Sequence, residues 1–188
     1  NHHSSWKQSQ PILKIAKTNN LIVIEDWAPS TGSYYYKKPG GSLGHLSAFS
    51  FYPTKNLGEY GDSGYIGTSI KKFADRALEL RKYGMRKLYY SEEHGINSRL
   101  DEVQAAIINL KLKKLNLWIK QRRKIANIYN KFLKGTSLIL PKENKNNFHS
   151  YYVYVVQHSN RKRLMDKLKK NNIYCNISYP FPIHLMRG

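Results

Sequence analysis

Cysteine is almost absent from this chain of 188 residues, since Cys175 is the only one. A single cysteine excludes an internal disulfide and fits a reducing compartment, so a cytoplasmic protein is expected. Uninterrupted apolar runs of about 18 residues are also lacking, so no membrane-spanning helix is expected. The first residues show no basic, apolar and small-residue pattern of a secretory leader.

Acidic residues are scarce as well. The chain has 12 of them against 32 lysines and arginines, which gives a formal net charge of +20. This balance is typical of proteins that bind nucleic acid or an anionic membrane surface. The lysines are spread through the sequence, however, and those in residues 111–124 fit the solvated face of a long helix. Nucleic-acid binding is therefore not expected as the main function, and no metal site is expected.

What the sequence does contain is an alternation of two apolar patterns. Short apolar runs predict strands, and the run at residues 21–25 has the pattern of a parallel strand buried on both faces. Ser98 with Asp101 is a variant of the capping box that predicts the start of a long helix. This alternation predicts an α/β fold with a largely parallel sheet. The expected strands are 21–25, 47–52, 65–68, 150–157 and 173–177, and the expected helices are 11–17, 72–83, 98–133 and 161–170.

Two polar residues follow strands in this scheme. Asp26 ends the first apolar run, and Lys55 comes just after the strand at 47–52. In open α/β sheets, ligands bind in the crevice outside the carboxyl ends of the strands. An amine that condenses with an aldehyde, together with an acid that keeps a pyridine nitrogen protonated, provides the minimal chemistry for pyridoxal phosphate.

Five separated motifs surround and follow these residues. They are Ile24-Glu25-Asp26-x-Ala28, Phe49 to Gly58, Gly61-Asp62-Ser63-Gly64, Gly95 to Ala106, and Tyr179-Pro180-x-Pro182-x-His184. Their order and spacing resemble the DegT-type sugar-nucleotide aminotransferases, a fold-type-I pyridoxal-phosphate family. The resemblance covers residues 11–185 and implies part of the large parallel or mixed-sheet domain, followed by the start of the small C-terminal α+β domain.

The resemblance also implies the site. Lys55 would bind pyridoxal 5'-phosphate covalently and move the proton between substrate and cofactor. Asp26 would pair with the pyridine nitrogen, and Ser50 would bind the cofactor phosphate. Asn97 would reach the phosphate of a neighbouring subunit, which implies a homodimer with shared active sites, and His184 would have a substrate role. Plainer alternatives are a surface lysine, a capping aspartate, an ordinary strand serine, a loop-ending asparagine and a packed or solvated histidine.

Three positions depart from the family pattern. Pro29 stands where the family usually has a glutamine that contacts the ring oxygen of the cofactor, and proline cannot donate a hydrogen bond. Trp27 replaces a small residue beside Asp26 and needs room. Ser178 replaces a histidine before Tyr179.

The resemblance further implies a division of the chain and its relation to longer proteins. Residues 1–134 are expected to form part of the large cofactor domain, including the long connecting helix, and residues 135–188 to begin the small domain. Family members are considerably longer. The chain is therefore expected to be a fragment cut at both ends or the remnant of a decayed gene.

Lysine rather than histidine at position 55 favours amino transfer over dehydration within the family. The segment from Tyr89 to Glu102 resembles the branch that aminates C-3 of dTDP-3-keto-6-deoxyhexoses, with L-glutamate as the expected amino donor. The excess positive charge suits an anionic cofactor and a nucleotide diphosphate. Two alternatives stay open: a C-4 aminotransferase acting on a UDP or GDP keto-sugar, and an inactive fragment that only binds anions or a partner subunit.

Overall fold

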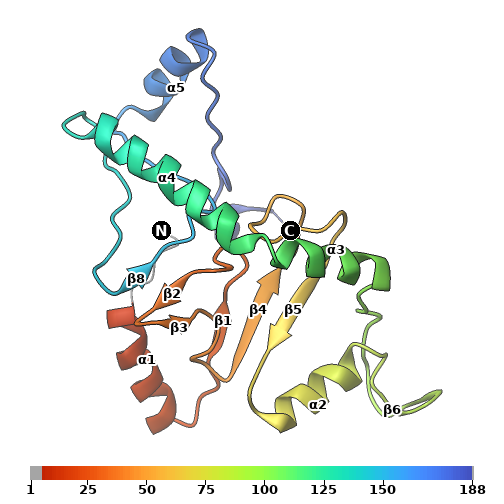
Figure 1. Ribbon diagram of the computed structural model, residues 1–188. Coiled ribbons are helices and arrows are strands. Elements are labelled where there is room, and N and C mark those ends of the chain that lie inside the picture. The colour runs from red at the N-terminus through yellow and green to blue at the C-terminus, as the bar shows by residue number, and fades with distance from the viewer. Residues whose placement is uncertain (1–5, 188) are drawn as a thin grey trace. The chain divides into compact units, whose positions relative to one another are not determined.

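A computed structural model describes residues 6–187 (Figure 1). Their contacts form two units. The first comprises the chain up to Tyr129 together with Lys142–Tyr154, and the second comprises Asn130–Pro141 together with the chain from Val155 onward. The expected division at residue 134 stays a prediction, and residues 1–5 and 188 of that division lie outside the described part.

The first unit contains a mixed three-stranded sheet. Its strands are β1 (Ile24–Asp26), β4 (Leu46–Ser50) and β5 (Gly64–Gly67), in the order β1-β4-β5 (Figure 1). β1 is parallel to β4, whereas β5 is antiparallel to β4. Within the described residues β1 is an edge strand, and its Ile24 is 66% exposed. The expectation of a strand buried on both faces was therefore wrong.

The shorter strands form two further sheets, one of three strands in the order β3-β2-β8 and one of two strands, β6 and β7. β2 (Tyr34–Tyr35) is antiparallel to both β3 (Lys38–Pro39) and β8 (Asn147–Phe148). β6 (Met85–Lys87) and β7 (Tyr90–Ser91) form a separate hairpin. The β2–β3 turn uses two residues with left-handed backbone, Tyr36 at φ +41° and Lys37 at φ +65°. Strands in residues 29–44 were not expected, because Ser, Gly, Tyr and Lys dominate that segment.

Helices account for most of the remaining regular structure. In the first unit α1 is longer than expected, and Pro11 lies inside it, where it removes one helical hydrogen bond. None of the helices within residues 6–187 combines the length and the apolar character that crossing a bilayer requires. The helices are α1 (Trp6–Thr18), α2 (Lys71–Leu80), α3 (Glu102–Leu112), α4 (Leu115–Leu133), α5 (Arg161–Lys170) and the 3-10 helix η1 (Ile183–Leu185).

The expected helix at 98–133 is divided in two and starts later. Ser98 does not cap it: the backbone N–H of Ser98 donates to the carbonyl of Arg81, which ties this segment to the end of α2. α3 begins at Glu102 after Asp101, whose side chain makes no capping hydrogen bond. A turn at residues 113–114 then separates α3 from α4.

Two expected strands do not form. Residues 150–157 contribute only an isolated bridge between Gln157 and Ile139, because Tyr151 has a left-handed φ of +49° that interrupts an extended chain. Residues 173–177 form no strand, and the N–H of Ile173 instead donates to Leu168 at the end of α5. α5 itself was predicted correctly, and the Asn160 side chain caps it by accepting from the N–H of Arg163.

The core of the first unit lies between the loop after β4 and the helix pair. Leu57 packs with Ile108, Leu115 and Ile119, and Phe51 packs against this cluster from its edge. Because Leu57 is only two residues beyond Lys55, this apolar anchor fixes the loop that carries the lysine.

Candidate functional site

Asp26 and Ser50 come from the carboxyl ends of two neighbouring parallel strands. The register pairs Asp26 of β1 with Ala48 of β4, two residues before Ser50. Lys55 follows in the loop directly after β4. Parallel strands end at the same edge of a sheet, so the three residues share that edge, as the sequence predicted.

The loop that carries Lys55 is tightly held. The N–H of Lys55 donates to the carbonyl of Tyr52 at 2.8 Å, which closes a turn around Pro53 and Thr54. At Gly58 an added Cβ would lie 2.6 Å from the carbonyl oxygens of both Tyr52 and Pro53, so only glycine fits there.

Asn56 joins this loop to the segment after Asp26. Its side chain is 6% exposed, and its Nδ2 donates to the carbonyl of Thr31 at 3.2 Å. This hydrogen bond couples the two loops that carry the lysine and the carboxylate. Asn56 belongs to the motif from Phe49 to Gly58, but the motif did not predict this role.

Asp26 and Ser50 each make one local hydrogen bond. Oδ1 of Asp26 accepts from the N–H of Ala28 at 3.0 Å, which stabilises the turn after β1. The Ser50 hydroxyl oxygen accepts from the N–H of Tyr52 at 3.3 Å and retains its own hydrogen for donation. Asp26 is exposed, and the charge of its carboxylate is available to a ligand at the sheet edge.

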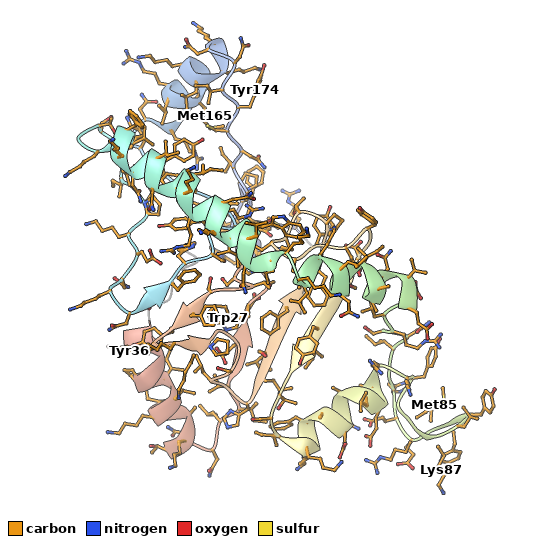
Figure 2. The ribbon with its side chains drawn as sticks, in the orientation of Figure 1. Trp27, Tyr36, Met85, Lys87, Met165 and Tyr174 are labelled. Atoms are coloured by element: carbon orange, nitrogen blue, oxygen red, sulfur yellow. The ribbon has the colours of Figure 1, made fainter. Side chains whose placement is uncertain are left out.

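The room for Trp27 is provided by a glycine. An added Cβ at Gly40 would lie 2.2 Å from Cζ3 of Trp27, so the ring lies directly over the backbone after β3 (Figure 2). Nε1 of Trp27 donates to Glu25 at 2.8 Å, and Glu25 also accepts from the N–H groups of Leu43 and Gly44. Trp27 and Glu25 thus fasten the loop after β3 to β1, while the Asp26 side chain takes no part in this network.

Pro29 cannot replace the hydrogen-bond donor that the family pattern has at its position. It lies in a turn closed by the N–H of Ser30, which donates to the carbonyl of Trp27 at 2.9 Å. The ring nitrogen of Pro29 has no hydrogen to offer a cofactor.

Asn97 belongs to a different part of the first unit, at the base of the β6–β7 hairpin. It forms an isolated bridge with Lys82, and its Oδ1 accepts from Nε of Arg99 at 3.1 Å. The expectation that a cap at Ser98 holds Asn97 at a helix N-terminus was wrong, since α3 begins at Glu102.

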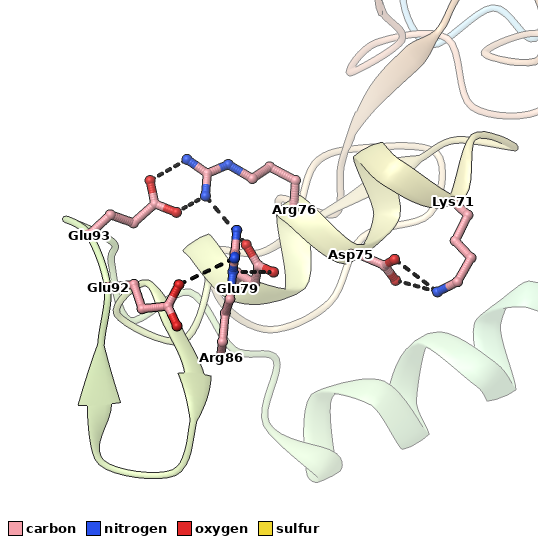
Figure 3. Close-up of polar contacts among 7 residues, drawn as sticks. All are labelled: Lys71, Asp75, Arg76, Glu79, Arg86, Glu92 and Glu93. Atoms are coloured by element: carbon pink, nitrogen blue, oxygen red, sulfur yellow. Dashed lines mark hydrogen bonds and ion pairs between the residues drawn. The ribbon is translucent and has the colours of Figure 1, made fainter.

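Ion pairs brace the hairpin against α2 (Figure 3). Arg76 of α2 pairs with Glu93 beyond β7, and Arg86 of β6 pairs with Glu79 of α2 at 3.0 Å and with Glu92 at 3.3 Å. The hairpin therefore has a defined attachment although its tip is exposed.

His184 lies in η1 of the second unit and is exposed. Ser178 lies in the segment between α5 and η1. The substrate role expected of His184 stays a prediction.

Two residues of α3 contact the loop after Lys55, and sequence analysis assigned neither a role. The N–H of Tyr60 donates to Oε1 of Gln104 at 3.2 Å. Nζ of Lys111 donates to the carbonyl of Gly58 at 2.5 Å and lies 4.5 Å from the centroid of the Tyr60 ring. Gln104 and Lys111 are seven residues apart, which puts them on one helix face, and this spacing was a usable signal.

The donor set at the sheet edge fits the cofactor that the resemblance implies. Lys55 offers an amine, Asp26 a carboxylate and Ser50 a hydroxyl hydrogen, and these match an aldehyde, a protonated pyridine nitrogen and a phosphate in turn. The half-buried position of Lys55 leaves its side chain accessible at this edge.

Comparison with known proteins agrees with this fit. The chain is 43% identical over 179 residues to dTDP-3-amino-3,6-dideoxy-alpha-D-galactopyranose transaminase of Aneurinibacillus thermoaerophilus, which covers 95% of this chain and 49% of that protein. It is 40% identical over 183 residues to dTDP-3-amino-3,4,6-trideoxy-alpha-D-glucose transaminase of Micromonospora megalomicea subsp. nigra. This match covers 94% of this chain and 49% of that protein. The chain thus spans about half the length of the curated relatives it matches.

A solved structure supports the fold. The crystal structure of a DegT DnrJ EryC1 StrS aminotransferase from Brucella abortus matches with a TM-score of 0.90 and 34% identity, over 98% of this chain and 48% of that chain. The expected fold class is therefore confirmed. The DegT/DnrJ/EryC1/StrS aminotransferase family matches residues 6–187. The chain belongs to this family.

Proposed function

We propose that this chain provides the lysine-bearing part of an aminotransferase that transfers an amino group from L-glutamate to C-3 of a dTDP-3-keto-6-deoxyhexose. Enzymes of the family use pyridoxal phosphate. The observation that carries the proposal is the common edge of Asp26, Ser50 and Lys55 on two neighbouring parallel strands. Since the relatives are about twice as long, the activity of the whole protein is part of the proposal.

Each of the three residues has a distinct task in this proposal. When bound, the cofactor would supply an electron sink that favours loss of the Cα proton from the amino donor. Lys55, through a neutral Nζ, would accept that proton and move it from the Cα of the amino donor to a carbon of the cofactor. The carboxylate of Asp26 stabilises the positive charge of the ring nitrogen, and the Ser50 hydroxyl donates to a phosphate oxygen.

A homodimer with shared sites is part of the proposal. Asn97 sits at the base of the β6–β7 hairpin, away from the loop after β4 that carries Lys55, and its local contacts are Lys82 and Arg99. At the hairpin tip, Leu88 is 81% and Tyr89 is 89% exposed, and apolar side chains of this kind favour a protein contact. These observations support an Asn97 that acts in the site of a second subunit.

Amination at C-3 rests on the relatives. The names of both transaminases describe a dTDP-sugar with the amino group at position 3. Amination at C-4 of a UDP or GDP keto-sugar is the alternative that the experiment must distinguish.

The experiment combines covalent labelling with product analysis. Borohydride reduction of the cofactor-loaded protein, followed by peptide mapping, should locate the cofactor on Lys55. With glutamate and dTDP-3-keto-6-deoxyglucose, NMR of the product should show nitrogen at C-3. Lys55→Ala should abolish turnover, whereas Lys72→Ala on the exposed face of α2 should not. A label on another lysine overturns the role of Lys55, and a C-4 amine overturns the substrate.

A further inference from the structure

Tyr152 touches both Lys55 and the residue before it. Nζ of Lys55 lies over the Tyr152 ring, 4.9 Å from its centroid. The Tyr152 hydroxyl and Oγ1 of Thr54 are 3.2 Å apart and share a hydrogen bond. One side chain from a distant stretch of the first unit therefore contacts the lysine loop at two points.

The backbone around Tyr152 is fixed from two sides. Nη1 of Arg122, on α4, donates to the carbonyl of Tyr152 at 3.1 Å. The preceding residue, Tyr151, is 6% exposed, and its ring stacks on His149 with centroids 4.2 Å apart. Tyr151 has a left-handed φ of +49°. At this bend the ring of Tyr151 is buried, while the side chain of Tyr152 extends to the lysine loop. Left-handed backbone at a bulky residue is strained, and such strain concentrates at functional sites.

We propose that Tyr152 is a positioning residue that receives the protonated amine of Lys55 whenever this amine is not bonded to a ligand. The negative face of an aromatic ring attracts an ammonium but not a neutral amine. The ring therefore holds Nζ beside the strand ends until a ligand displaces it. The inference rests on the proposed function only in assuming that Lys55 is the amine that reacts.

The hydroxyl and the ring of Tyr152 have separable tasks in this arrangement. The ring makes the contact with the charge, and the hydrogen bond to Thr54 orients the ring. Tyr152→Phe keeps the ring and loses only the hydrogen bond. Tyr152→Leu removes the ring but keeps an apolar side chain.

The test measures the reactivity of Lys55 in the cofactor-free chain. Trace acetylation with acetic anhydride, read for each lysine by mass spectrometry, is compared between the native chain, Tyr152→Phe and Tyr152→Leu. At neutral pH we expect Lys55 to react about two- to fivefold faster in Tyr152→Leu, since this is the range for a partly exposed cation–π contact. Tyr152→Phe should stay within about twofold of the native rate. Lys72, exposed on α2, should react equally in all three.

Removal of the Tyr152 ring also opens space around the Lys55 amine. The pH dependence of the acetylation rate separates this greater accessibility from the loss of the charge contact. At about pH 11 most lysine amines are neutral, so a charge effect must disappear there, whereas greater accessibility would persist. Circular dichroism verifies that each variant is folded. An unchanged rate in Tyr152→Leu, or a gain that persists at high pH, would overturn the inference. The result does not depend on bound cofactor, so it can hold or fail separately from borohydride labelling of Lys55.

Discussion

Asp26 combines a local structural bond with an exposed charge. Its Oδ1 accepts from the N–H of Ala28, and an asparagine oxygen at the same place accepts the same bond. Asp26→Asn therefore keeps the turn after β1 and removes only the negative charge. This separation makes the residue suitable for testing the electrostatic role.

We expect Asp26→Asn to lower turnover about a hundredfold or more. Loss of the carboxylate weakens protonation of the ring nitrogen, and each pKa unit of lost stabilisation corresponds to about tenfold in rate. Steady-state kinetics with a saturating keto-sugar measures the loss. Asp75→Asn is the matched control, because Asp75 forms only an exposed ion pair with Lys71 on α2. Near-native turnover of Asp26→Asn would show that this residue is not the ring partner.

At the scale of elements, Arg123 of α4 binds residues both before and after β8. Nη1 and Nη2 of Arg123 donate to the two carboxylate oxygens of Glu143, at 2.6 and 3.0 Å. Nη1 also donates to the carbonyl of His149, and the guanidinium lies 4.2 Å from the centroid of the Phe148 ring. Burial acts to raise the pKa of Glu143, but the hydrogen bonds from Arg123 and from the N–H of His149 outweigh it, so this pKa is lowered.

A carboxyl group whose pKa is lower in the folded than in the unfolded protein stabilises the fold at pH values above the unfolded pKa. This stabilisation is lost as the pH falls through the folded pKa. We expect Glu143→Gln to lower the free energy of unfolding by about 1 kcal/mol at neutral pH. The difference from the native chain should shrink as the pH falls through the lowered pKa of Glu143, because protonated glutamate and glutamine are both uncharged. Urea denaturation at several pH values measures it.

The control for this variant is Asp166→Asn, which removes an exposed ion pair with Lys162 on α5. It should change stability by less than about 0.5 kcal/mol. An effect of Glu143→Gln that is the same at neutral and acid pH would contradict the role of the ion pair.

The elements also show which parts of the fold are local in origin. The helix at 161–170 was predictable because Asn160 caps it and no distant contact is needed to define it. The edge shared by Asp26 and Lys55 was predictable because β1 and β4 are parallel neighbours. The Tyr- and Val-rich stretch from residue 150 was misread as a strand, because its β propensity is outweighed by contacts with Arg122 and by the left-handed Tyr151.

Other features depend on distant contacts that a single sequence does not display. α3 starts only at Glu102, and the segment before it is tied to α2 by the hydrogen bond from the N–H of Ser98 to the carbonyl of Arg81. The contact between Tyr152 and Lys55 joins residues almost a hundred positions apart, and no spacing rule connects them. Sequence reasoning thus located the chemical groups at the sheet edge but not the side chains that hold them.

At the scale of the whole molecule, the proposed dimer has a direct consequence for damaged subunits. Lys55 and Asn97 lie in separate parts of the first unit, so each subunit would contribute Lys55 to one site and Asn97 to the other. A mixed dimer of Lys55→Ala and Asn97→Ala subunits then carries both lesions in one site and leaves the other site intact. Such complementation is possible only when symmetric subunits share their sites.

We expect an equal mixture of inactive Lys55→Ala and weakened Asn97→Ala protein to recover about a quarter of native activity. Random exchange makes about half of the dimers mixed, and each mixed dimer has one intact site of its two sites. Activity after subunit exchange, with exchange verified by mass spectrometry of differently tagged subunits, measures this recovery. The control is a mixture of two differently tagged Lys55→Ala proteins, which should recover no activity. If verified mixed dimers gain no activity over Asn97→Ala alone, Asn97 acts within its own subunit or not at all, and the shared site must be abandoned while the role of Lys55 is unaffected.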